Sequence, residues 1–306
     1  MTEVSASLVK ELRELSGAGM MDCKKALNAT AGNIESAIDW LRKKGLSSAA
    51  GKAGRIAADG LVGLAIEGTQ AALVEVNAET DFVARNQEFQ QFVENVSKLA
   101  LKANDTENLK KTSYLTTNTS VEEQLVHLIA KIGENLSLRR LAKLSVKQGV
   151  IAGYIHNAQT PNLGKIGVLV ALESEVNSDE LKTLGKQLAM HIAATSPLAL
   201  SIKDLDFKLI EHEKSIFAEQ AKISGKPDNI VEKMVEGRLR KYYEEVVLLE
   251  QTFVIDGESK IKSVIENLSK KAGKPVHLTG FVRMALGEGI QKEEKDFANE
   301  VAAQLK

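Results

Sequence analysis

The sequence is poor in cysteine and in long apolar runs, and its charges nearly cancel. Cys23 is the only cysteine among 306 residues, which excludes an internal disulfide and fits a reducing compartment. The net charge of −1 does not supply the basic field that general nucleic-acid binding requires. The longest apolar runs, such as "IGVLVAL", fall far short of the ~20 residues of a membrane-spanning helix, and the first residues lack the apolar stretch of a secretory signal. We therefore expect a soluble cytoplasmic protein with no direct contact to nucleic acid or membrane.

The sequence also lacks the motifs of phosphate binding, metal binding and catalysis. "GLSSAAGKA" is one residue too long for a phosphate-binding loop, and Ala53 stands where that loop needs Ser or Thr. "GAGMMD" misses the third glycine of a dinucleotide-binding fingerprint. The histidines show no ligand-like spacing; they are His127, His156, His191, His212 and His277. The sequence thus predicts no enzyme, no cofactor and no metal site.

Residues 1–46 predict a small unit of three helices. The first helix carries an apolar residue every three or four positions, namely Val4, Leu8, Leu12 and Leu15. Asp22 is expected to cap the second helix and Asn33 the third. "GAGMM" places Met20 and Met21 in a glycine-rich loop, either as plugs of the core or as a flexible contact surface. The following "GLSSAAGKAGRIAADG" is typical of a mobile linker.

The remainder shows a weak internal repeat of the form β-β-α-α-β. The first half is expected to contain strands 61–66 and 71–77, helices 87–102 and 121–133, and strand 136–145. The second half is expected to contain strands 150–156 and 165–172, helices 178–194 and 259–271, and strand 277–285. This order predicts an α+β fold with two antiparallel sheets, each covered by helices on one side.

An insertion at residues 203–250 interrupts the second half. Its apolar residues recur at near-heptad intervals on both sides of "SGKPDN", which predicts an antiparallel helical hairpin. A thin hairpin buries little apolar surface against itself, so we expect it to self-associate or to contact a partner. Ile216, Ile223 and Met234 are the candidates for such a dimer contact.

The end of the chain predicts a terminal helix with one apolar stripe that includes Phe297 and Val301. The polar segment 104–119 matches no motif.

The predicted domains are a helical module with linker at 1–54, a first core subdomain at 55–148, a second at 149–202 and 251–288, the hairpin at 203–250, and a terminal module at 289–306.

The stretch "AETDFVARN" raises the main question about function, because Phe82 stands at a strand-to-helix junction. Phe82, Phe89 and Val96 are spaced by seven and could share one buried helical face. Phe82 could instead be exposed there to contact another molecule. The residues alone leave both interpretations open.

Several longer motifs together resemble the bacterial elongation factor Ts family. They are "LVKELRELSGAGMMDCKKAL", "AADG", "EVNAETDFVARN", "KIGENLSLRR", "SGKP", "EKMVEGRL" and "GEGI". The resemblance covers nearly the whole chain in the right order. It implies a ubiquitin-associated-like N-terminal module, a two-part α+β core, a dimerisation hairpin and a C-terminal helix. It also implies that the protein is the guanine-nucleotide exchange factor of elongation factor Tu, present as a homodimer or as a dimer of heterodimers with that partner.

The resemblance favours partner contact for Phe82. The matching family segment, here Thr80, Asp81, Phe82 and Val83, is inserted toward the magnesium and nucleotide site of the partner. Phe82 would enter an apolar pocket and shift the elements that hold the ion and the phosphate, which would displace both.

Other positions match partner contacts of the family. Leu12, Met20 and Met21 match the contact with the partner's nucleotide domain, and His156 matches a contact with a different domain, although a lone histidine is more often an ordinary surface residue. Ile132 and Gly133 match a contact at a helix C-terminus, where glycine permits a left-handed turn. Phe297 and Val301 either cap the core or dock on the partner. The alternative function is a structural adaptor or chaperone that assembles complexes through its helical modules.

Overall fold

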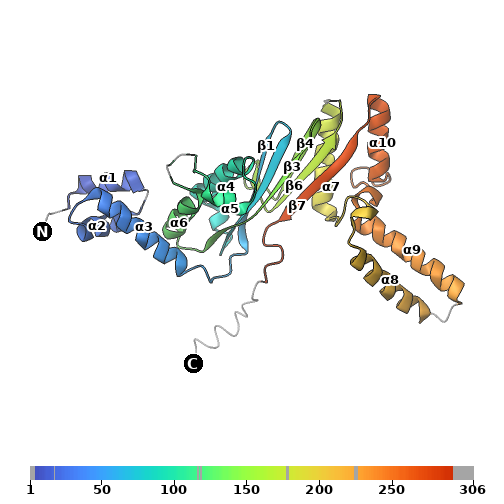
Figure 1. Ribbon diagram of the computed structural model, residues 1–306, viewed down its shortest axis with the longest axis horizontal. Coiled ribbons are helices and arrows are strands. Elements are labelled where there is room, and N and C mark those ends of the chain that lie inside the picture. The colour runs from blue at the N-terminus through green and yellow to red at the C-terminus, as the bar shows by residue number, and fades with distance from the viewer. Residues whose placement is uncertain are drawn as a thin grey trace. The chain divides into compact units, whose positions relative to one another are not determined.

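The computed structural model describes residues 4–16, 18–115, 117, 119–176, 179–223 and 227–291, and it shows an α+β fold of helices and antiparallel sheet (Figure 1). The chain forms two compact units. Unit 1 contains Met1–Gly63, Val74–Leu141 and Ala285–Lys306, and unit 2 contains Leu64–Leu73 and Ala142–Met284. Each boundary falls inside a strand, so the two units share strands β1, β2, β3 and β7, whose bounds follow below.

The N-terminal helices form the predicted three-helix unit (Figure 1). Helices α1 (Ala6–Ser16), α2 (Met20–Ala29) and α3 (Ile34–Ala50) enclose a small core of Val9, Leu12, Cys23, Ala26, Leu27 and Ala37. Asn33 caps α3 as predicted, because its side chain accepts a hydrogen bond from Ser36 N at 2.8 Å.

The prediction that Asp22 caps the second helix is wrong. Helix α2 begins two residues earlier, at Met20, and the extended Gly19 occupies its N-cap position. Asp22 therefore lies in the first turn, where a carboxylate interacts favourably with the helix dipole, and it forms an ion pair with Lys44.

The predicted mobile linker is wrong over residues 45–50, which continue α3 as far as Ala50. Here α3 packs against α6 (Val121–Ile132). A Cβ atom on Gly45 would lie 3.6 Å from Val126 and 3.9 Å from Ala130, so the absence of a side chain lets the helices approach closely. Composition favoured a linker because glycine and serine have low helix propensity, and packing against α6 overrides that preference.

The first half of the core contains the five predicted elements. They are β1 (Asp59–Glu67), β2 (Gln70–Ala78), α4 (Gln87–Ala100), α6 and β3 (Leu136–Ser145). The four-stranded sheet has the order β3-β2-β1-β5, in which β5 is the short Leu163–Gly164. The polar segment between α4 and α6 holds a further short helix, α5 (Thr106–Lys111), whose Leu109 is fully buried.

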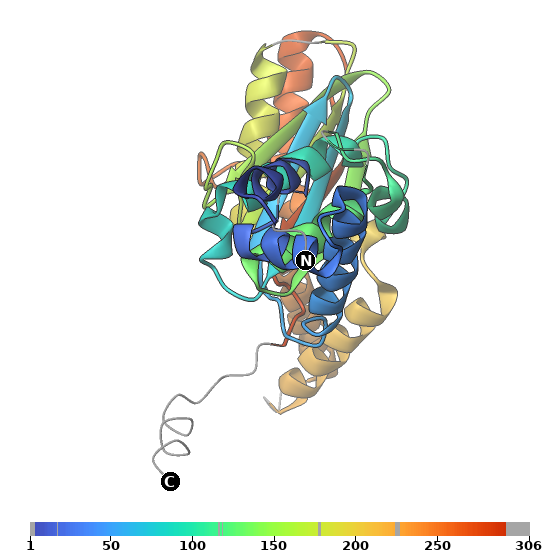
Figure 2. The ribbon, with the colours of Figure 1, turned by 90° about the vertical axis from the view of Figure 1, so that its left-hand side faces the viewer.

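The second half also contains its five predicted elements. They are β4 (Gly149–His156), β6 (Ile166–Glu173), α7 (Asp179–Thr195), α10 (Ile261–Ala272) and β7 (His277–Ala285). The sheet order is β4-β6-β7, and β4 and β6 pair antiparallel with Gly149 opposite Glu173. Helix α7, yellow-green in Figure 2, packs on β4 and β6 and lies beside the orange α10.

Helices α8 (Phe207–Lys222) and α9 (Asp228–Val246) form the predicted hairpin (Figure 1). Two short 3-10 helices flank it, η2 (Ile202–Asp204) and η3 (Leu248–Glu250). Only Ala221, Val231 and Val235 are buried between the helices, in agreement with the expectation that the hairpin has a small internal core. The predicted terminal helix, with Phe297 and Val301, lies outside the described residues.

Candidate functional site

The most prominent exposed side chain of the first half belongs to Phe82, which is 74% exposed. Strand β2 is buried along nearly its whole length and ends at Ala78. Residues 79–86, here called the Phe82 loop, then lead to α4 and include the single turn η1 (Val83–Arg85). Val83 and Ala84, which follow Phe82 directly, are buried. The chain thus turns two neighbours into the core and leaves the aromatic ring in solvent.

The structure excludes one of the two interpretations of Phe82, and its contact with a partner stays a prediction. Phe89 and Val96 are fully buried on α4, but that helix begins only at Gln87. Asn86 has an extended backbone and caps α4 by accepting hydrogen bonds from two backbone N–H groups, which ends any helical continuity toward Phe82. The interpretation of Phe82 as the first residue of a buried helix face is therefore wrong.

The Phe82 loop is fixed at its start by the turn that follows α6. Glu134 accepts hydrogen bonds from Thr80 N at 3.0 Å and from Thr80 Oγ1 at 2.7 Å. Glu79 accepts one from Asn135 N at 2.5 Å, and Arg55 donates to the same carboxylate at 3.4 Å. Because hydrogen bonds to a carboxylate are stronger than those between neutral groups, this arrangement holds the backbone two residues before Phe82 in one place.

Ile132 is the last residue of α6 and Gly133 its C-cap, so both directly precede Glu134, which bonds to Thr80. Gly133 ends α6 with φ of 87°, as predicted, and its N–H donates to Ile129 O at 2.9 Å. An added Cβ would meet no atom within 4 Å, so glycine is favoured here by its left-handed backbone and not by lack of space. The role of this turn in partner contact stays a prediction.

The methionines of the N-terminal unit are exposed. Met20 and Met21 begin α2 and are 60% and 66% exposed, so the interpretation as core plugs is wrong. Leu12 is fully buried in the core of the three helices. Its side chain therefore does not form part of the exposed surface.

The remaining candidates are distributed over unit 2. His156 ends β4, is exposed, and its Nδ1 lies 3.1 Å from the hydroxyl of Tyr154. On the hairpin, Ile223 is 86% exposed, Ile216 is half-buried, and Met234 packs beside the small hairpin core. These positions leave apolar surface available on the hairpin, and their role in self-association stays a prediction.

Sequence reasoning missed the polar residues that hold the loop, Arg55, Glu79, Glu134 and Asn135. No local pattern marks them, because Thr80 and Glu134 are 54 positions apart. A second group was missed in β2, where Glu75 and Asn77 are buried in an otherwise apolar strand. That alternation of polar residues was a visible signal, since a buried carboxylate requires a partner.

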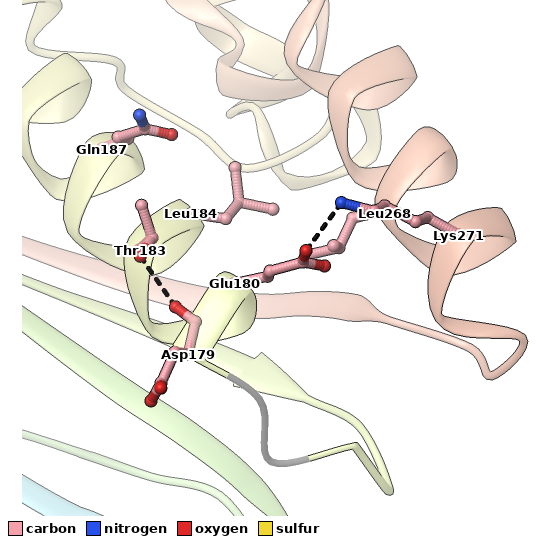
Figure 3. Close-up of a pocket in the computed structure, with 7 residues that line it drawn as sticks. All are labelled: Asp179, Glu180, Thr183, Leu184, Gln187, Leu268 and Lys271. Carbon is pink, nitrogen blue, oxygen red and sulfur yellow. Dashed lines mark hydrogen bonds and ion pairs between the residues drawn. The ribbon is translucent and has the colours of Figure 1, made fainter.

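A shallow pocket of about 350 Å³ lies between α7 and α10 (Figure 3). Two contacts join residues that line it: Lys271 pairs with Glu180 at 2.6 Å, and Thr183 donates to the backbone of Asp179 at 2.7 Å. Among the described residues, no cluster of His, Cys, Asp and Glu could hold a metal ion. Within that same part of the chain, no helix is both long and apolar enough to span a membrane. What the Phe82 loop presents to solvent is an aromatic side chain.

Comparison with known proteins gives consistent relatives. A family model described as "Elongation factor TS" matches residues 79–288. A protein named elongation factor Ts from Rhodospirillum rubrum is 61% identical, with the whole of both chains covered. Proteins of the same name from Paramagnetospirillum magneticum and Rhodospirillum centenum are 61% and 60% identical, and each comparison covers 99% of this chain. The coverage of those two relatives is 98% and 99%.

Proposed function

The chain belongs to the elongation factor Ts family of translation elongation factors, and from this premise we propose that it is the guanine-nucleotide exchange factor of elongation factor Tu. The observation that carries the proposal is the exposure of Phe82 on a loop whose start is held by Glu134. A rigid, exposed aromatic side chain loses little conformational entropy on binding and is a common anchor of protein interfaces.

In this proposal Phe82 enters an apolar pocket of the partner and displaces the elements that hold its magnesium ion and the nucleotide phosphate. Asp81, which is also exposed, stands beside it at the partner's ion site. Thr80 and Val83 act from within this protein: Thr80 through its bonds to Glu134, and Val83 through its buried side chain. The magnesium ion and the nucleotide belong to the partner, and no bond is made or broken here, so the protein is not an enzyme.

The exchange follows from linkage between two ligands of the partner. If binding of this protein weakens nucleotide affinity tenfold, about 1.4 kcal/mol, then bound nucleotide weakens the affinity for this protein by the same factor. Fresh nucleotide therefore expels the factor and completes the cycle.

Further contacts would secure the complex. Seven further residues of this chain are proposed to contact the partner: Met20, Met21, Ile132, Gly133, His156, Phe297 and Val301. The domains proposed from the sequence, at 1–54, 55–148, 149–202 with 251–288, 203–250 and 289–306, would each contribute one surface. The hairpin would join two copies through Ile216, Ile223 and Met234. The exposure of Ile223 also favours the second candidate function, an adaptor that assembles complexes through this hairpin.

The release of a fluorescent guanine nucleotide from elongation factor Tu tests the proposal. The protein should accelerate release, and Phe82→Ala should slow it by about 30-fold, because truncation of an aromatic anchor costs about 2 kcal/mol or more. The melting temperature should hardly change, since substitution of an exposed side chain alters stability by about 0.5 kcal/mol at most.

Leu198→Ala is the matched control, because Leu198 is a large apolar residue of similar exposure, 62%, on another part of the chain. It should release nucleotide like the parent protein. A parent protein that leaves the release rate unchanged would contradict the exchange function. A Phe82→Ala variant that melts early yet releases nucleotide normally would contradict the role given to Phe82.

A further inference from the structure

The turn that follows β7 adopts a conformation that requires glycine. In "ALGEGI", residues 285–290, Gly287 and Gly289 have φ of 71° and 77°. A Cβ on Gly287 would lie 2.4 Å from Ala58 O, so the turn also passes too close to the chain before β1 for any side chain. Such a turn must be held by specific contacts, because glycine makes the unfolded chain more flexible.

A buried carboxylate provides the central contact. Glu75 of β2 is fully buried and accepts a hydrogen bond from Gly287 N at 2.8 Å. The same carboxylate accepts bonds from Arg139 at 3.1 and 3.2 Å, from Arg140, and from Asn77 at 2.9 Å. Burial would raise the pKa of Glu75, but the bonds from Gly287 N–H, Arg140 and Asn77 outweigh it and hold that pKa below its usual value.

The two arginines each connect this carboxylate to the turn. Arg140 donates from Nη2 to Ala285 O at 2.7 Å and lies 3.3 Å from the Glu288 carboxylate. Arg139 donates from Nη2 to Glu288 O, also at 2.7 Å. We call Glu75, Arg139 and Arg140 the Glu75 clasp. All of its residues and the turn belong to unit 1.

Stability alone does not explain this arrangement. A buried ion pair often contributes no more to stability than apolar residues of the same volume, since removing both charges from water is costly. The clasp does specify a single geometry, because the planar guanidinium groups bond in fixed directions. The clasp lies at the last described turn before residues 292–306, where a fixed geometry can set the direction of the chain.

We propose that Glu75 is a positioning residue whose clasp fixes the direction in which the chain leaves β7, and thereby presents residues 292–306 to the partner. The second clause rests on the proposed function, in which Phe297 and Val301 contact elongation factor Tu. The first clause concerns unit 1 alone and can be tested without a partner.

Glu75→Gln is the discriminating variant. Both carboxylate oxygens of Glu75 accept hydrogen bonds. Oε1 accepts from Gly287 N, Asn77 and Arg139, and Oε2 accepts from Arg139 and Arg140. A glutamine of the same shape would turn an NH2 group toward one set of donors. Glu180→Gln is the control, because it removes an exposed ion pair remote in sequence from the turn.

Hydrogen exchange measured by mass spectrometry on peptides covering residues 285–291 tests the first clause. Glu75→Gln should accelerate amide exchange there about tenfold or more, because the Gly287 amide loses a charge-assisted bond, while Glu180→Gln leaves it unchanged. Unchanged exchange in Glu75→Gln would overturn the proposal. If Glu75→Gln does not fold, Arg139→Lys replaces it, since a single ammonium cannot bond Glu75 and Glu288 O in the same way.

Binding to nucleotide-free elongation factor Tu, measured with and without residues 292–306, tests the second clause. Glu75→Gln should weaken binding about tenfold in the full chain and have no effect in the chain that ends at residue 291. An equal loss in both backgrounds, or no loss in the full chain, would overturn the positioning role. If the parent protein does not bind the partner at all, the proposed function is wrong, and hydrogen exchange still decides whether the clasp holds the turn.

Discussion

The two halves of the core repeat the same devices at corresponding places. Gly60 at the start of β1 and Gly149 at the start of β4 have φ of 120° and 138°. A Cβ on either would lie 2.2 and 2.1 Å from a carbonyl oxygen of the facing strand, Val76 and Leu172 respectively. Gly133 and Gly273 end α6 and α10 in the same left-handed conformation. These parallels are what a repeated β-β-α-α-β unit would produce.

Ion pairs and strand-end contacts follow the same rule. The second residue of the first helix pairs with the penultimate residue of the second helix: Glu88 with Lys131 and Glu180 with Lys271, both at 2.6 Å. The end of the second strand is bonded to the turn after the second helix in both halves. In the second half this contact runs from Ser174 to Pro275 O, at 2.9 Å.

The halves differ in the segment between the second strand and the first helix. The first half has eight residues there, 79–86, and the second half has five, 174–178. The additional length of the first half holds Phe82. A short extension in one half thus places an exposed aromatic side chain on a scaffold whose glycines, ion pairs and strand-end contacts are otherwise the same in both halves.

The largest effect is expected at the paired glycines. Gly60→Ala and Gly149→Ala should each lower the free energy of unfolding by about 3 kcal/mol or more, because alanine is strained at positive φ and its Cβ meets a backbone oxygen. Urea denaturation measures both. Gly237→Ala is the control: this glycine lies inside α9 with no atom near an added Cβ, so alanine should stabilise by about 0.5–1 kcal/mol. A large loss in only one of the two halves would mean that the two glycines do not have equivalent roles.

Variants of the two strand-end contacts are expected to lose similar stability but to differ in nucleotide release. Glu134→Ala should cost about 1–2 kcal/mol, from the loss of bonds to a charged group, and should slow nucleotide release because the Phe82 loop is no longer held. Ser174→Ala should cost about 1 kcal/mol and leave release unchanged. Melting curves and release rates of both variants provide the test. Equal effects on release would show that the Glu134 contact has no special role.

Each half also contains a histidine whose pKa is lowered by burial, His127 in α6 and His191 in α7. Hydrogen bonding from His191 to Gln251 opposes the shift without cancelling it. The unfolded state then binds more protons than the folded state, so stability is complete above the unfolded pKa near 6.5 and falls as the pH drops below it.

For one such group the slope is at most about 1.4 kcal/mol per pH unit. Denaturation of the parent, His127→Gln and His191→Gln between pH 7.5 and 5.5 should show a smaller slope in each variant. A slope that both variants leave unchanged would assign the acid sensitivity to other groups.

The smallest effect is expected for the paired salt bridges. Glu88→Gln and Glu180→Gln should each change stability by about 0.5 kcal/mol or less, because both pairs are exposed and their charges are screened by water. Adding 1 M salt should remove even that difference. A loss above 1 kcal/mol in either variant would mean that the pair is needed to hold its helices together.

Much of the fold could be predicted because its signals are local. Strands β3 and β7 begin and end at the predicted residues, 136–145 and 277–285. Apolar periodicity is a property of a few neighbouring residues, and the hairpin helices α8 and α9 followed from it in the same way. The resemblance of "ETDFVARN" to a known family then directed attention to Phe82.

Contacts between distant residues could not be predicted in this way. The placement of Phe82 depends on where α4 begins and on the bond between Thr80 and Glu134, which are 54 positions apart. The contact of the Glu75 clasp with Gly287 joins residues 212 positions apart. The last turns of α3 are another example: their composition predicts a linker, but they are helical because they pack against α6. The type and order of the elements follow from the amino-acid sequence, because backbone preference and apolar periodicity act over single turns and strands. Which side chains are buried, hydrogen-bonded or exposed follows only from the folded chain, because burial depends on surfaces brought together from distant parts of the sequence.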